Sequence, residues 1–183
     1  MKWLAGASAR KDYEQFVLEI TAGLLRTGYL MTWDLSEAEN LVQETLLRAA
    51  LRWPTIRGME YRQAYVRRIL VNLALDGSIQ RSRTREEISH VHDPPLDLLA
   101  DPVGDAQLLQ IETRSEILCL LADLSLRQRA VIVLRYFEDL SESDIASTLG
   151  WPVGTVKSTA SRALEQLQRA VIEKRTGFPV VNE

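Results

Sequence analysis

Several residue types and patterns are scarce in this sequence, and each shortage excludes a class of protein. Cys119 is the only cysteine, so no internal disulfide can form, and the apolar residues around it predict a buried thiol. No apolar run approaches the roughly 18 residues of a membrane span, and no apolar segment follows Lys2 as in a signal peptide. His90 and His92 have no third histidine or cysteine near them, so no metal is expected, and no other cofactor is indicated. These shortages predict a cytoplasmic protein without membrane insertion.

Alternating apolar and polar residues, the pattern of a half-buried strand, are also missing. Apolar residues instead recur at helical spacing, as Tyr13, Phe16 and Ile20 do in the first such segment. Helices are expected over about residues 9–27, 36–53, 61–80, 103–121, 125–137, 141–149 and 152–174. Hydrophobic residues make up 46% of the 183 residues, which is enough for packed cores. The sequence therefore predicts an all-α protein.

Local signals suggest where some of these helices begin and end. Ser36 with Glu39, and Ser125 with Gln128, have the spacing of a capping box at a helix N-terminus. Gly28 is expected to mark the end of the first helix, although apolar residues follow it and could continue a bent helix.

Charge is distributed unevenly along the chain, although its net value is only −3. Residues 48–85 contain nine arginines and no lysine against two acids, a net charge of +7. Residues 86–112 contain seven acids and no lysine or arginine, a net charge of −7. This asymmetry suggests a nucleic-acid surface beside an acidic segment, although a solvated arginine face has the same composition. With its prolines, the segment over residues 86–102 is predicted to be a flexible linker between domains over residues 9–85 and 103–175.

Residues 140–158 have the pattern of a helix-turn-helix. Ser141 is a suitable N-cap, Gly150 suits the left-handed residue that ends a helix, and Pro152 can begin the next one. The second helix has an apolar side and a polar side. The polar side carries two cations and two hydroxyls: Lys157, Ser158, Ser161 and Arg162. Such a face suits a helix that enters the DNA major groove, but an ordinary helical hairpin with a solvated face shows the same pattern.

The helix expected over residues 36–53 is apolar on two sides. Leu47 and Leu51 continue a mixed stripe beside Gln43 and Glu44, away from the main apolar face. A helix of this kind either lies inside a bundle or docks a partner, and the pattern does not distinguish these two possibilities.

Cations and aromatic residues interleave at the start of the helix expected over residues 61–80 and just before it. They are Arg52, Trp53, Arg57, Tyr61, Arg62 and Tyr65. A basic groove with aromatic platforms suits single-stranded nucleic acid, because bases stack on aromatic rings. Trp53 and Tyr65 could instead be core residues, the commoner position of an aromatic. Asn72, with Arg67 and Arg68 near it, could bind a base or a phosphate or belong to a solvated face.

Four motifs occur in order along the chain: Val42–Thr45, Ala64–Asp76, Leu124–Val131 and Val153–Ser158. In this order and at these separations they resemble the extracytoplasmic-function (group 4) sigma factors of the sigma-70 superfamily, most of all the actinobacterial SigE-like subset. The resemblance covers about residues 12–172. It implies a sigma-2 helical bundle and a sigma-4 helix-turn-helix domain, in a protein that is not itself an enzyme.

The resemblance also implies partners, and by motif position it assigns residues to them. The implied partners are core RNA polymerase, through its clamp helices and flap, promoter DNA in double- and single-stranded form, and an anti-sigma factor. Core polymerase would contact Leu41, Gln43, Glu44, Leu47 and Arg48. The −10 element and the melted strand would contact Trp53, Arg57, Tyr61, Arg67, Arg68 and Asn72. The −35 element would contact Lys157, Ser158, Ser161 and Arg162.

Two other functions are compatible with a helix-turn-helix. A transcriptional regulator that acts without core polymerase, of the response-regulator kind, would need a βα receiver domain of about 120 residues, but no strand pattern precedes Leu124. A DNA enzyme such as a recombinase would need a compact catalytic constellation, and none stands out in the sequence.

Overall fold

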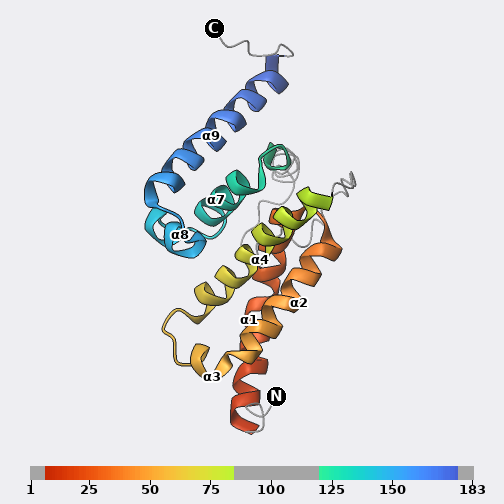
Figure 1. The fold of residues 1–183 in the computed structure, drawn as a ribbon, viewed down its shortest axis with the longest axis vertical. Coiled ribbons are helices and arrows are strands. Elements are labelled where there is room, and N and C mark those ends of the chain that lie inside the picture. The colour runs from red at the N-terminus through yellow and green to blue at the C-terminus, as the bar shows by residue number, and fades with distance from the viewer. Residues whose placement is uncertain (1–6, 85–119, 177–183) are drawn as a thin grey trace, which may run out of the picture. The chain divides into compact units, whose positions relative to one another are not determined.

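The fold is entirely helical in the parts of the chain that the structure describes (Figure 1). In this computed structural model those parts are residues 7–84 and 120–176. The helices are α1 (Ala7–Thr32), α2 (Leu35–Leu51), α3 (Trp53–Ile56), α4 (Arg62–Thr84), α7 (Leu126–Tyr136), α8 (Glu142–Leu149) and α9 (Val153–Thr176). The all-α prediction is confirmed.

The chain divides into two compact units, residues 1–100 and 101–183. The first is described through α1 to α4 and the second through α7 to α9. Several predicted features lie outside the described residues. These are the acidic linker over residues 86–102 with His90 and His92, nearly all of the helix expected over residues 103–121 with Cys119, and residues 177–183.

The first unit is a helical bundle in which α1, α2 and α4 each pack against the other two. The apolar stripe predicted for α1 is buried at Phe16 and Leu24, and Val42 of α2 and Leu70 of α4 are buried with it. Helix α3 is a short segment between α2 and α4 (Figure 1). Pro54 lies in its first turn, where a missing N–H costs no helical hydrogen bond.

Helix α1 does not end at Gly28 but continues to Thr32. The glycine serves the packing of α1 on α2 instead. A Cβ atom at Gly28 would lie 3.4 Å from the Cβ of Ala38, so a larger side chain would push the two helices apart. The expectation that Gly28 ends the helix was wrong, and the apolar residues after it do continue α1.

The N-cap of α2 is Asp34, and the predicted capping box of Ser36 with Glu39 is wrong. A carboxylate oxygen of Asp34 accepts a hydrogen bond from the N–H of Glu37 at 2.8 Å. The chain turns at Trp33, whose φ is +59°, and Asp34 is the first extended residue after that turn. Ser36 therefore already lies in the first turn of the helix, too late to cap it.

In the second unit α7, α8 and α9 pack together, and the predicted signals at their ends are present. The Ser125 hydroxyl accepts from the N–H of Gln128, whose side-chain oxygen accepts from the N–H of Ser125, which confirms the capping box. The Ser141 hydroxyl caps α8 by accepting from the N–H of Asp144 at 3.2 Å. Gly150 ends α8 with a φ of +68°, a conformation that favours glycine. Local sequence thus sets the turn into α9.

Arg129 of α7 is buried and joins this helix to the chain that precedes it. Its guanidinium donates hydrogen bonds to the backbone carbonyls of Leu121, Ala122 and Leu124 at 3.1, 2.9 and 3.0 Å. Burial lowers the pKa of Arg129 to about 10, so the group stays charged at neutral pH. Carbonyls at a helix end lack helical partners, and this arginine supplies donors to them.

Candidate nucleic-acid interface

Helix α9 presents the predicted polar face to solvent. Its opposite side is buried at Val156, Ala160 and Ala163, which hold it against the rest of the second unit. The polar face carries the predicted residues Lys157, Ser158, Ser161 and Arg162, and all of them are exposed. The two faces predicted for this helix are therefore both present.

The polar groups of this face differ in how firmly they are held. The Ser158 hydroxyl donates to the backbone carbonyl of Thr155 at 3.1 Å, and the Ser161 hydroxyl donates to the carboxylate of Glu165 at 3.0 Å. Within the residues that the structure describes, Arg162 forms no ion pair. Its guanidinium is thus available to a groove or a phosphate without first breaking an internal pair.

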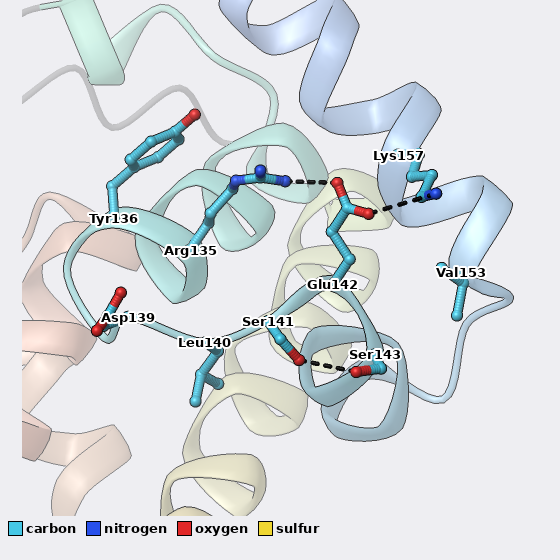
Figure 2. A pocket seen from close by; sticks show the side chains of 9 residues that line it. All are labelled: Arg135, Tyr136, Asp139, Leu140, Ser141, Glu142, Ser143, Val153 and Lys157. Carbon is cyan, nitrogen blue, oxygen red and sulfur yellow. Dashed lines mark hydrogen bonds and ion pairs between the residues drawn. The ribbon is translucent and has the colours of Figure 1, made fainter.

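A hollow of about 780 Å³ lies beside the start of α9 (Figure 2). Residues from the end of α7, the following loop, the start of α8 and the start of α9 line it. They are Arg135, Tyr136, Asp139, Leu140, Ser141, Glu142, Ser143, Val153 and Lys157. Two cations, Arg135 and Lys157, are among the lining residues.

Glu142 lies between the two cations of this hollow (Figure 2). Its carboxylate accepts a hydrogen bond from Arg135 at 2.6 Å, and its other oxygen is 3.6 Å from the ammonium of Lys157. The hydrogen bond from Arg135, with the nearby Lys157 charge, lowers the pKa of Glu142, and the same hydrogen bond raises the pKa of Arg135. Both shifts favour the charged forms of Glu142 and Arg135 at neutral pH.

Sequence reasoning selected Lys157 but missed its two neighbours. Arg135 and Glu142 lie in different helices, joined by a loop, so helical periodicity does not connect them. Arg127 makes a cation–π contact that also joins two elements. Its guanidinium lies 5.1 Å from the centre of the Trp151 ring in the turn before α9.

In the first unit, Trp53 is a core residue and not an exposed platform for a base. Its side chain has 0% exposure. Its ring lies 5.0 Å from that of Tyr13 and 4.9 Å from that of Phe16, measured between ring centres. The prediction that Trp53 stacks on DNA fails in this structure, because the ring fills the space between α3 and α1. The alternative kept open for Trp53, a place in the core, is the one observed.

The other residues predicted for the −10 element are at least partly exposed. Tyr61 precedes α4 and has 72% exposure, and Arg57 and Arg68 are also exposed. Arg67 and Asn72 are half-buried on α4. Tyr61 is thus the aromatic residue of this set whose ring can reach a base.

Asp12 of α1 lies close to two cations of this region. Its carboxylate oxygens are 3.8 Å from Arg57 and 3.7 Å from Arg62. Arg62 also places its guanidinium 5.2 Å from the centre of the Phe16 ring. These contacts bind the segment between α3 and α4, which carries Tyr61, to the first helix.

Helix α2 carries the second apolar side that its pattern predicted, and in the structure that side is exposed. Its inner side is buried at Val42, Thr45 and Ala49, whereas Leu47 and Leu51 have 46% and 57% exposure. The other residues assigned to polymerase contacts lie on the same helix, with Gln43 and Arg48 exposed and Leu41 and Glu44 half-buried. Arg48 donates to the carboxylate of Glu44 at 2.7 Å.

The described residues lack two features, a membrane-spanning helix and a cluster of metal-ligand side chains. None of the helices there is long and apolar enough to cross a membrane. No group of three or more histidine, cysteine, aspartate or glutamate side chains in that part of the chain is placed to hold a metal ion.

Comparisons with known proteins agree on one kind of relative. Residues 114–167 match the family described as Sigma-70, region 4. The RNA polymerase sigma-E factor of Streptomyces coelicolor is 33% identical over 163 residues, which are 89% of this chain and 88% of that protein. The RNA polymerase sigma-E factor of Streptomyces avermitilis is 34% identical over 90% of this chain and 87% of its own length.

A solved structure is also similar. The sigma factor RpoE of Bartonella quintana, in complex with the anti-sigma factor NepR, is 26% identical with a TM-score of 0.67. The match covers 88% of this chain and 97% of that one.

Proposed function

Since the chain belongs to the extracytoplasmic-function RNA polymerase sigma factors, we propose that it binds core RNA polymerase, directs it to promoters with −10 and −35 elements, and promotes DNA melting. The observation that carries the proposal is the similarity to sigma-E factors over 89–90% of the chain. The polymerase performs the chemistry, and the chain acts as a cytoplasmic binding factor and not as an enzyme. A helix-turn-helix regulator that acts without core polymerase does not account for similarity over so much of the chain.

Helix α9 is the reader of the −35 element in this proposal. Lys157, Ser158, Ser161 and Arg162 share its exposed face, while the buried side of the helix fixes its orientation. A short hydroxyl permits close approach to the major groove, and each cation can bind a phosphate or the edge of a guanine. Arg162 is the strongest candidate for a base contact, because no ion pair in the described residues competes for it.

The segment between α3 and α4 and the outer face of α4 act on the −10 element. Tyr61 stacks on an unpaired base, and Arg57, Arg67, Arg68 and Asn72 bind the strand that melting exposes. Stacking of a base on an aromatic ring contributes roughly 1–3 kcal/mol, which offsets part of the cost of unstacking the duplex. Trp53 supports this surface from within the bundle.

The outer face of α2 docks on the clamp helices of the polymerase. Leu47 and Leu51 are large apolar side chains left exposed on a packed helix, and burial against a partner would remove that surface from water. Leu41, Gln43, Glu44 and Arg48 surround them, and the second unit binds the flap. Because RpoE of Bartonella quintana was solved with an anti-sigma factor, we also propose that a protein of that kind restrains this chain.

A reconstituted transcription assay tests the proposed function. Core polymerase alone and core polymerase with the full chain are given a library of genomic DNA from the native cell, and transcript starts are mapped. We expect transcripts that begin at a defined set of sites only when the chain is present. An absence of such transcripts, together with tight duplex binding by the chain alone, would instead support a regulator that works without core polymerase.

A further inference from the structure

A charge cluster of Arg135, Glu142 and Lys157 lies beside helix α9. Its carboxylate stands where a DNA-binding surface would bind phosphates more strongly without a negative charge. Glu142 begins α8, Arg135 comes from α7 and Lys157 comes from α9. The carboxylate contacts both cations, at 2.6 and 3.6 Å, and all three side chains line the same hollow (Figure 2). The hollow is open to solvent, and Lys157 keeps 64% of its side chain exposed.

A phosphate that approaches Lys157 or Arg135 meets competition from Glu142. Each cation that neutralises a phosphate releases bound counterions, and this release supplies most of the sequence-independent affinity for DNA. Two cations with one carboxylate between them act on a phosphate as about one net positive charge. The same carboxylate holds Arg135 through a charge-assisted hydrogen bond at 2.6 Å and attracts the ammonium of Lys157 at 3.6 Å.

We propose that Glu142 is a positioning residue that holds Lys157 and Arg135 and lowers the affinity of the helix-turn-helix for arbitrary duplex DNA. The inference rests on the proposed function, because it takes the exposed face of α9 as the duplex-binding surface. As a consequence, the second unit by itself binds duplex DNA weakly. Stable binding to a promoter then depends on contacts made elsewhere in the initiation complex.

The salt dependence of binding measures this effect. Affinity for duplex DNA falls with salt with a slope of about 0.9 per phosphate neutralised. If Glu142→Gln frees one net charge, the slope steepens by about 0.9, and the fall in affinity from 50 to 200 mM salt grows about 3.5-fold. We also expect affinity at 50 mM salt to rise at least threefold, because the cations no longer have to leave a carboxylate.

The experiment uses the full chain and a fluorescently labelled random-sequence duplex of about 20 base pairs, with binding followed by anisotropy at several salt concentrations. Asp139→Asn is the matched control. Asp139 lines the same hollow but forms no ion pair in the described residues, and its φ of +50° suits asparagine as well as aspartate. Asp139→Asn removes the same charge without freeing Arg135 or Lys157. The salt dependence of its DNA affinity should therefore have a slope close to that of the unchanged chain.

A second set of variants separates the effect of the charge cluster from the general effect of removing one negative charge. In a chain that already carries R135Q and K157Q, Glu142→Gln should lose most of its effect. The proposal is overturned if Glu142→Gln and Asp139→Asn behave alike, or if Glu142→Gln keeps its full effect without the two cations. Promoter-dependent transcription by the unchanged chain is measured in parallel, so that failure of this inference and failure of the proposed function give different results.

Discussion

Replacement of Trp53 distinguishes a core role for this residue from a role in DNA contact. The ring is fully buried and packs on Tyr13 and Phe16. Truncation of a buried aromatic residue to alanine usually costs about 3–5 kcal/mol, a large share of the stability of a small domain. We therefore expect Trp53→Ala to destabilise the first unit strongly, whether or not DNA is present.

Trp53→Phe is the more informative change. It keeps an aromatic ring between Tyr13 and Phe16, and it removes an indole N–H that has no hydrogen-bond partner among the described residues. Loss of an unsatisfied buried donor offsets part of the lost packing, so we expect a cost of about 1 kcal/mol. Urea unfolding of the full chain, followed by circular dichroism, measures both values.

Tyr61→Ala is the matched comparison, because Tyr61 is exposed in the same region. We expect its free energy of unfolding to change by less than about 0.5 kcal/mol. Open-complex formation with core polymerase should fall about 5- to 150-fold, the equivalent of one lost stacking contact. If Trp53→Phe folds with nearly full stability yet loses open complexes as Tyr61→Ala does, Trp53 contacts DNA and its assignment to the core role alone is wrong.

Four further substitutions test other parts of the structure. Arg129→Met should cost about 3 kcal/mol or more, because buried carbonyls lose their donors; urea unfolding that shows less than 1 kcal/mol would contradict this. Arg162→Ala should reduce −35-dependent transcription, while the variant still binds core polymerase. Leu47→Ala should instead weaken binding to core polymerase. A pull-down with core polymerase distinguishes the two variants. Gly28→Val should lower the thermal midpoint, because its side chain would meet Ala38, 3.4 Å from a Cβ at that position; an unchanged midpoint would refute the close approach of α1 and α2.

Features that depend on neighbouring residues were predictable from the sequence. The helical spacing of apolar residues, the capping box of Ser125 with Gln128 and the left-handed Gly150 all involve groups within a few positions of one another. Such short-range preferences survive in the folded chain because nothing opposes them there. The polar face of α9 was predictable for the same reason, since the period of a helix fixes which residues share a side.

Predictions failed where two local signals competed or where another element decided the outcome. Asp34 and Ser36 are both good caps, and the turn at Trp33, with φ +59°, selects Asp34. Gly28 resembles a helix end by itself, but in the fold it lies where α1 closely approaches Ala38 of α2. Trp53 lies within an arginine-rich stretch, yet its ring packs against α1 and is buried.

Within the described residues, the sequence by itself determined the helices other than the short α3, most of their ends and the two-sided character of α2 and α9, because these follow from spacing along one element. Only the tertiary structure decided which aromatic ring is buried and which carboxylates lie between cations. Glu142 meets Arg135 across a loop and Lys157 across a turn, and Asp12 reaches Arg57 from another helix. Contacts of this kind depend on how elements pack in space, and no repeat in the sequence records them.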